Sequence, residues 1–375
     1  MRGFILLLTG LALAALSLLL SRVPGVVEWG YGTTLGPALA RRLSLATGWI
    51  PISVSLGGLL LLVAWVGWRA VAGIRAVRAG RIKPLEALGR GAARGGGLVG
   101  VLLIAFYLLW GLNYARAPLE ARLDLVVPED DLATLIALAE HAVDRVNEAY
   151  VTLHGTPDAD APTAITLDPA RLSSEMRTGW IRVGDALGMG GWADRPYGPV
   201  KVRGSTWYLQ AFDLLGIYSP FTGEAHVNGA APTIVAAASI GHEQAHQRTI
   251  TRESEATFAG ALAAIHTDDP LLRYAGWARI VRSVLRDLGD ADADARETMG
   301  DRLHRGVLRD WQDYARWSEE NRSVAGPVAS AVNDGYLRTH RVPGGIRSYA
   351  MDTRLFTAWF ARHDGRLVLP GTPGG

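Results

Sequence analysis

The stretch Ser239-Ile-Gly-His-Glu-Gln-Ala-His-Gln-Arg248 decides how the rest of the sequence is interpreted. It continues an apolar segment, residues 233–240, which predicts a buried helix. Residues four apart lie on one face of a helix, so His242 and His246 can offer two imidazole nitrogens to one tetrahedral metal ion. Glu243 lies beside them and can polarise a bound water. The spacing therefore predicts the helix of a zinc hydrolase.

A catalytic zinc ion usually takes three protein ligands, and the nearest further candidates are Glu253 and Glu255. If the helix ran straight on, Glu253 would lie roughly 10 Å further along the axis, at about 1.5 Å per residue, and out of reach. The chain must therefore turn back. The β-branched run 249–251 weakens helix continuation, and Thr251 could cap a second helix. We expect Glu253 as the third ligand, with Glu255 as the alternative.

A different interpretation is that these residues decorate an ordinary amphipathic helix and bind nothing. The acidic pair and the apolar lead-in favour a metal site. Buried imidazoles and carboxylates need partners, and one cation supplies them all.

Four stretches extend the motif into a resemblance that covers most of the chain. They are Trp110-Gly-Leu-Asn-Tyr-Ala-Arg116, Gly216-Ile-Tyr-Ser-Pro-Phe-Thr-Gly-Glu-Ala-His-Val-Asn228, residues 242–257, and Val332-Asn-Asp-Gly-Tyr-Leu337 with Ser348-Tyr349. With them the chain resembles the bacterial membrane family called domain of unknown function 3810. The resemblance implies an integral protein of the bacterial cell (inner) membrane with a zincin-like metallopeptidase domain. It implies no particular substrate.

The chain is also distantly similar to membrane zinc peptidases of the CaaX-prenyl-protease type. These carry Glu-x-x-x-Asp on the helix after HExxH, and their Glu binds zinc. This similarity implies Glu253 as the ligand, but Thr257 stands at the Asp position and Thr249 stands where those proteins tend to have Gly. The first departure puts histidine orientation in doubt. The second puts the bend in doubt and keeps Glu255 as an alternative.

Three apolar spans indicate a membrane region at residues 1–112. The chain has 375 residues and a positive mean hydropathy. Residues 4–20, 49–68 and 95–112 are each close to the roughly 20 residues that cross a bilayer as a helix. The first span is either a retained anchor or a cleaved signal peptide. We expect three transmembrane helices followed by one domain at residues 113–375.

The charges between the spans predict the orientation. The second loop carries seven basic residues and one acidic residue, namely Arg69, Arg75, Arg78, Arg81, Lys83, Arg90 and Arg94 against Glu86. Because basic loops stay in the cytoplasm, this loop is expected there and the catalytic domain is expected to be extracytoplasmic. The loop has no aromatic residues to stack on bases, so nucleic acid is not an expected partner.

The remaining pattern predicts a mainly α, α+β, zincin-like domain. Without cysteine it has neither disulfides nor thiolate metal sites. Helices are expected at 130–153, 271–288, 296–316 and 347–363, and strands at 164–167, 200–203 and 225–228. Residues 221–228 could be the edge strand that holds a peptide. On it, Glu224, His226 and Asn228 form either a substrate-binding face or an ordinary polar one.

Together these features predict a membrane-anchored zinc metallopeptidase of the gluzincin type that acts on peptide or protein substrates. Glu243 would be the general base, and Tyr336, His340 and Tyr349 are candidate donors to the oxyanion. The alternative is a membrane sensor or assembly factor that keeps the zincin fold and binds peptides without cleaving them. A permease is disfavoured because the spans lack charges suited to a translocation path. The pattern does not predict an oligomeric state.

Overall fold

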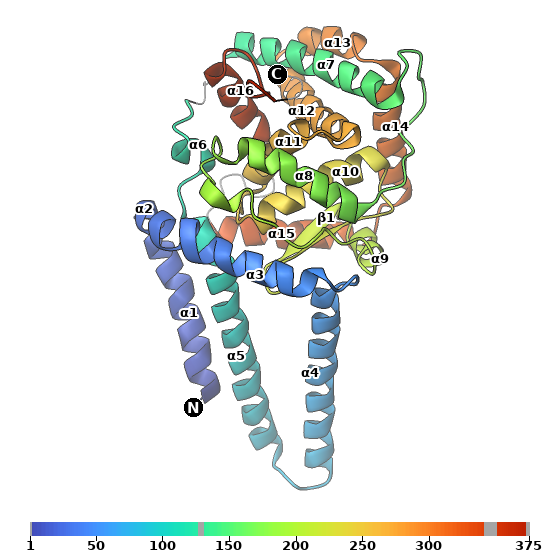
Figure 1. Ribbon diagram of the computed structural model, residues 1–375. Coiled ribbons are helices and arrows are strands. Elements are labelled where there is room, and N and C mark those ends of the chain that lie inside the picture. The colour runs from blue at the N-terminus through green and yellow to red at the C-terminus, as the bar shows by residue number, and fades with distance from the viewer. Residues whose placement is uncertain (1, 127–130, 341–350, 373–375) are drawn as a thin grey trace.

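The protein consists of a stem of three long helices and a helical body at one end of the stem (Figure 1). The computed structural model describes residues 2–126, 131–340 and 351–372. The stem contains α1 (Arg2–Leu20), α4 (Val54–Arg78) and α5 (Pro84–Leu109). A connection crosses from α1 to α4 beneath the body through α2 (Pro24–Val27), a π-helix (Glu28–Leu35) and α3 (Gly36–Gly48).

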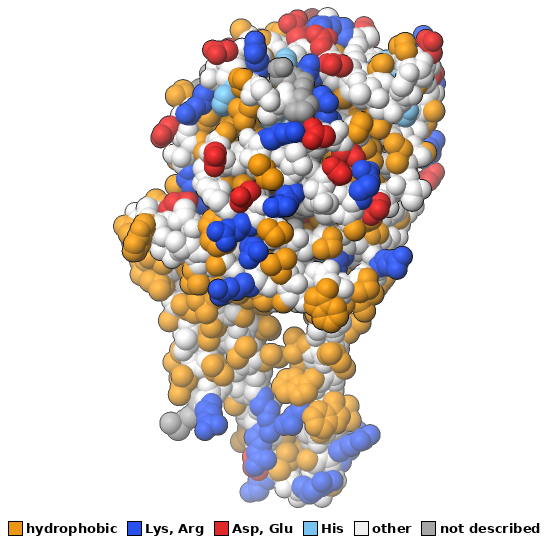
Figure 2. Space-filling model, in the orientation of Figure 1, with side chains coloured by type: hydrophobic (Ala, Val, Ile, Leu, Met, Phe, Trp, Pro, Cys, Tyr) orange, Lys and Arg blue, Asp and Glu red, His pale blue; other side chains and the backbone are white. Residues whose placement is uncertain are grey.

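All three stem helices are long and apolar enough to cross a membrane. Their positions match the three expected spans, but α4 and α5 extend much further into the basic segment. Only residues 79–83 separate them, so several arginines expected in a loop lie on helices. Hydropathy marks the apolar part of a helix, whereas arginine is a good helix former and lets the helix continue. The basic residues therefore gather at the tip of a helical hairpin (Figure 2).

The apolar side chains of the stem face outward. Helix α4 buries none of its residues, and Leu61 and Val63 keep 74% and 60% of their surface exposed. Figure 2 shows hydrophobic side chains along the stem and acidic side chains mainly on the body. Such exposure is costly in water, and it is compatible with a stem surrounded by lipid.

The body is almost entirely helical. Its helices are α6 (Leu119–Arg122), α7 (Leu132–His154), α8 (Pro169–Gly184), α9 (Thr206–Ala211), α10 (Thr233–Gln247), α11 (Glu253–Ile265), α12 (Pro270–Ala291), α13 (Ala293–Asp301), α14 (Arg305–Glu320), α15 (Gly326–Thr339) and α16 (Asp352–Arg362), with 3₁₀ turns at Gly111–Ala115 and Gly190–Trp192. Helices α10, α11 and α12 pack on one another at the centre.

Helix α11 lies inside the core of the body, and every residue from Glu255 to Ile265 is buried. It approaches α10 closely because both helices carry glycine at the crossing. A Cβ at Gly260 would lie 2.5 Å from the carbonyl carbon of Gly241, which is closer than real Cβ atoms come. Small residues thus bring the start of α11 within reach of the histidines on α10.

The described residues contain one sheet, made of β1 (Gly216–Ser219) and β2 (Glu224–Val227). The strands are antiparallel, with Gly216 opposite Val227. The expected strand at 225–228 corresponds to β2, whereas residues 200–203 contribute only a bridge from Lys201 to His226. No strand forms at 164–167, since no neighbouring strand is there to pair with it.

Two further expectations need correction, and a third falls partly outside the described residues. Strand β2 is paired on both sides, so β1 and not residues 221–228 provides the free edge. The helix expected at 296–316 is divided into α13 and α14, because the His304 side chain caps a new helix by accepting from the Gly306 N–H at 3.1 Å. The last expected helix begins at Asp352, and residues 347–350 lie outside the described ranges.

The polar residues of β2 join the body to the stem. The buried carboxylate of Glu224 pairs with Lys201 and accepts from the backbone N–H groups of Val54 and Ser55, at 2.9 and 2.7 Å. These groups lie in the first turn of α4, where a negative charge is stabilised. His226 Nε2 lies 3.2 Å from Ser55 Oγ. Glu224 and His226 thus belong to the joint and do not form a substrate-binding face.

Candidate metal centre

The structure brings together the three residues that the sequence predicted as metal ligands. His242 and His246 lie on α10, and Glu253 opens α11. One Oε2 atom of Glu253 lies 3.1 Å from His242 Nε2 and 3.4 Å from His246 Nε2. One ligand atom from each residue lies within 4.8 Å of the other two, so the three could hold a single ion.

A sharp turn at Thr249 brings Glu253 back to the histidines. Thr249 adopts a φ of 66°, in the left-handed region that a residue with a Cβ rarely adopts. Arg116 contacts this turn, with its Nη1 lying 3.4 Å from the Thr249 carbonyl and hydroxyl oxygens. The expected bend is therefore made by threonine in place of glycine, and a buried arginine from the segment after α5 supports it.

Both imidazoles are held by their second ring nitrogen. His242 Nδ1 hydrogen-bonds with Thr257 Oγ1 at 3.1 Å, and His246 Nδ1 donates to the Ile250 carbonyl at 2.7 Å. These contacts direct each Nε2 toward Glu253. Thr257 stands where the more distant peptidases have aspartate, and its hydroxyl supplies the orienting contact that the substitution had put in doubt.

Glu255, the alternative ligand, is directed away from this site. Its carboxylate accepts from the Leu119 N–H at 3.0 Å and pairs with Arg252 at 3.0 Å and Arg122 at 3.4 Å. Arg122 also lies 3.9 Å from Glu28, in the connection between α1 and α4. Glu255 therefore ties the start of α11 to the segments beside the stem.

Glu243 is buried next to the histidines, and its Oε2 has no hydrogen-bond partner among the described residues. Burial raises the pKa of this carboxyl to about 8, and the charge of Glu253 adds to the effect. A Cβ at Gly216 would collide with the Glu243 carboxylate, so glycine is required where β1 crosses it. Glu243 thus lies directly beneath the edge strand.

The charges of the centre compensate one another. Burial lowers the pKa of His246, but the Glu253 carboxylate outweighs it and raises that pKa to about 9. Burial raises the pKa of Glu253, but the two histidines bring it well below its usual range. For His242 burial dominates and its pKa is lowered. A carboxylate between two imidazoles is thus held ionised.

A cavity of about 1120 Å³ opens over these residues. Its walls include the end of α5 at Phe106 and Trp110, the outer edge of β1 at Ile217 and Tyr218, and one face of α15. The Trp110 ring lies edge-on to His246, with 5.6 Å between ring centres. The cavity thus reaches the body's junction with the stem, and most of the residues around it are apolar.

The three candidate oxyanion donors differ in position. Tyr336 lines the cavity, and its hydroxyl accepts from Trp110 Nε1 at 3.0 Å and donates to the Tyr114 hydroxyl at 3.0 Å. His340 packs behind it against the Tyr114 and Tyr336 rings. Tyr349 lies outside the described residues. Of the two candidates that can be placed, only Tyr336 borders the cavity.

Sequence reasoning missed the arginines of α12 that line the same cavity, namely Arg279, Arg282 and Arg286. Their spacing of three and four residues places them on one helix face, and this spacing was a signal that could have found them. Arg279 and Arg286 pair with the buried carboxylate of Asp352, at 3.1 and 3.2 Å. One wall of the cavity is therefore basic.

The comparisons with known proteins found one family. The sequence model of the family described as "Protein of unknown function (DUF3810)" matches residues 31–356, which include the whole centre. No curated protein and no solved structure matches the chain.

Proposed function

The chain belongs to the family described as protein of unknown function (DUF3810), and we propose that this member is a membrane-anchored, zinc-dependent peptidase of the zincin type. One observation carries the proposal. His242, His246 and Glu253 converge within 4.8 Å in a large cavity, beside the buried Glu243, whose Oε2 has no hydrogen-bond partner in the described part of the chain.

The donor set fits zinc. Two imidazole nitrogens and one carboxylate oxygen are the ligands of many catalytic zinc sites, which keep a further position open. The Nδ1 contacts to Thr257 and Ile250 direct both Nε2 atoms toward the Glu253 carboxylate, and a bound ion would replace their contacts with it. A cation would also balance the ionised Glu253 carboxylate, which is mostly removed from solvent. When bound, zinc would lower the pKa of a water and polarise a carbonyl group.

The chain's own residues supply the rest of the chemistry. With a cation beside it to keep its carboxyl ionised, Glu243 would take the proton of the attacking water and later deliver it to the leaving amine, with no covalent intermediate. The outer edge of β1 has no strand partner in the described part of the chain, so it could pair with an extended peptide above Glu243. Tyr336 borders the cavity, and its O–H would serve a developing oxyanion by turning away from the Tyr114 hydroxyl.

The stem would anchor this chemistry in the bilayer. Its three helices have the length and composition of membrane spans, and the basic tip of the α4–α5 hairpin favours the cytoplasmic side. The body would then lie outside the cytoplasmic membrane of a bacterial cell, with the cavity close to the membrane surface.

The decisive experiment compares wild-type protein with Glu243→Gln, both as full chains purified in detergent. We expect about one zinc per chain in both proteins, because Glu243 is not one of the three residues whose ligand atoms converge. Wild type should cleave members of a broad peptide library, and the variant should lose about 10²- to 10⁴-fold of that rate. Zinc binding without cleavage by wild type would instead favour the alternative, a peptide-binding sensor or assembly factor.

A further inference from the structure

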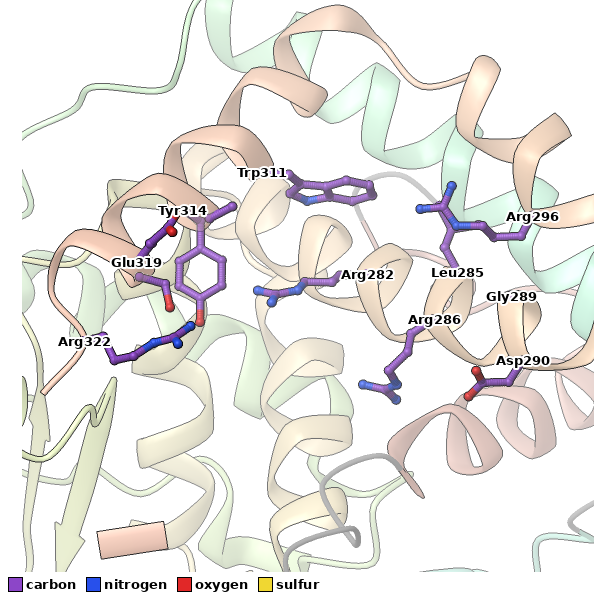
Figure 3. A pocket seen from close by; sticks show the side chains of 12 residues that line it. Arg282, Leu285, Arg286, Gly289, Asp290, Arg296, Trp311, Tyr314, Glu319 and Arg322 are labelled. Carbon is purple, nitrogen blue, oxygen red and sulfur yellow. The ribbon is translucent and has the colours of Figure 1, made fainter. Parts of the chain in front are cut away.

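The cavity of the centre continues into a second cavity of about 710 Å³ between α12 and α14 (Figure 3). The two cavities share five lining residues, namely Arg282, Arg286, Trp311, Tyr314 and Arg322. A ligand that occupies the metal centre could therefore extend into the second cavity without leaving the protein surface.

The second cavity has a surplus of positive charge. Four arginines line it against two acidic residues, Asp290 and Glu319. Arg286 is paired with Asp352 and Asp287, and Arg279, one turn before Arg282 on α12, is paired with Asp352 as well. Asp352 is fully buried, so it holds these two guanidinium groups in place from behind.

Arg282 and Arg322 differ from the two arginines that pair with Asp352, because within the described ranges neither of them forms an ion pair with a carboxylate. Both side chains are exposed. The Arg282 guanidinium lies over the Tyr314 ring, 4.4 Å from its centre. In Figure 3 the Arg282 and Arg322 side chains both extend toward Tyr314. Two available guanidinium groups thus meet at one aromatic ring on the path from the metal centre.

We propose that Arg282 and Arg322 form a subsite that binds a carboxylate of the peptide substrate, either an acidic side chain or the free C-terminus. This inference rests on the proposed peptidase function. A guanidinium group presents paired N–H donors that match a carboxylate, and the stacking of Arg282 on Tyr314 leaves its N–H edges free. The enzyme would then prefer peptides with a negative charge on one side of the scissile bond.

The test measures peptide binding to the full-length Glu243→Gln protein in detergent with zinc added, so that cleavage does not interfere. Three fluorescein-labelled probes share one sequence. The first has glutamine at one position and an amidated C-terminus, the second has glutamate there, and the third has glutamine with a free C-terminus. Fluorescence anisotropy gives each Kd at low salt.

We expect the second or the third probe to bind about tenfold more tightly than the neutral one, as for a charge-assisted contact. Which of the two gains affinity identifies the source of the carboxylate. Arg282→Gln or Arg322→Gln should remove most of the gain, and added salt should reduce it. The control is Arg316→Gln, an exposed arginine on α14 that pairs with Asp313 and lines neither cavity. It should keep the gain.

Equal binding of all probes, no binding of any probe, or a gain that survives both arginine substitutions would overturn the subsite. These results differ from a failure of the proposed function. Wild type that cleaves neutral and acidic peptides equally well refutes only the subsite. Arginine-dependent binding of acidic peptides by a protein that cleaves none refutes only the peptidase.

Discussion

Two carboxylates with neighbouring histidines lie in this body, Glu224 buried and Glu253 partly exposed, and their surroundings are built in opposite ways. Glu224 is fully engaged by Lys201 and by two N–H groups at the start of α4. Glu253 faces two imidazoles, and the Glu243 carboxylate beside it has an oxygen without a partner. The first cluster is closed, whereas the second opens into a cavity of about 1120 Å³.

The comparison shows how to separate a structural cluster of charges from a functional one. Removing a charge from solvent is costly in both places. At the stem joint Lys201 and the two N–H groups of α4 compensate the Glu224 carboxylate. At the centre the Glu253 carboxylate is balanced by the histidines, but the buried Glu243 carboxyl keeps an oxygen that has no partner among the described residues. Four predictions test this distinction.

The largest effect is expected for His246→Ala, which removes one of the three converging ligand atoms. Zinc content, measured by mass spectrometry of the purified full chain, should fall from about one per chain to none. The loss should exceed the roughly 10- to 100-fold that removing an orienting contact costs. A variant that retains stoichiometric zinc would show that the three residues are not the site.

Lys201→Met should destabilise the closed cluster around Glu224 and leave the open cluster at the metal centre unchanged. Breaking a buried ion pair on one side leaves an unpaired charge and costs about 3 to 5 kcal/mol of unfolding free energy. Thermal unfolding in detergent measures the loss, and the folded variant should bind zinc as wild type does. The double variant Lys201→Met, Glu224→Gln should recover part of the stability. A single variant as stable as wild type would contradict the assignment of a structural role.

The closed cluster should also make the protein sensitive to acid. Burial lowers the pKa of His226 to about 4, from an ordinary value of 6.5. The unfolded chain therefore binds the proton first. The stabilisation is fully present above pH 6.5 and is lost as the pH falls toward 4, by an amount on the order of 2 kcal/mol.

Unfolding in EDTA at pH 7 and at pH 4.5 tests this prediction, with the metal excluded from both measurements. The stability lost between these pH values should be smaller in His226→Gln than in wild type. Because His141 and His266 also have pKa values lowered to about 4, part of the acid sensitivity should remain. An unchanged difference would show that His226 titrates normally.

The smallest effect is expected for Thr257→Val, which keeps the shape of the side chain and removes its hydroxyl. His242 would lose the contact at its Nδ1, and zinc affinity should fall about 10- to 100-fold. Thr257→Ser keeps the hydroxyl and should retain most of the affinity. Competition with a fluorescent chelator measures both. Equal affinities for the valine variant and wild type would show that the hydroxyl does not orient the ligand.

The sequence was informative where local spacing fixes the geometry. Four residues from His242 to His246 place both rings on one helix face, and the β-branched run before Glu253 correctly indicated a turn. The three apolar spans could be predicted because hydropathy is also a local property of the sequence. Their function in a membrane and the binding of zinc stay predictions.

The partners of the buried charges could not be predicted, since they come from distant parts of the chain. Glu224 meets the first turn of α4 about 170 residues away, and Glu255 meets Leu119. Local propensity also overstated the sheet at residues 164–167, which pair with no strand. Only the folded chain shows that Glu255 ties the start of α11 to Leu119 while Glu253, two positions earlier, faces the histidines.

The close crossing of α10 and α11 has one more consequence. Gly241 precedes His242, and Gly260 lies about two turns after Glu253. The contact between the backbones of the two glycines therefore sets the position of α11 relative to α10. A methyl group at either glycine would push the two helices apart. The Glu253 carboxylate would then move away from both imidazoles, although none of the three ligand residues had been changed. The geometry of the candidate metal centre therefore depends on the absence of a side chain at Gly241 and at Gly260.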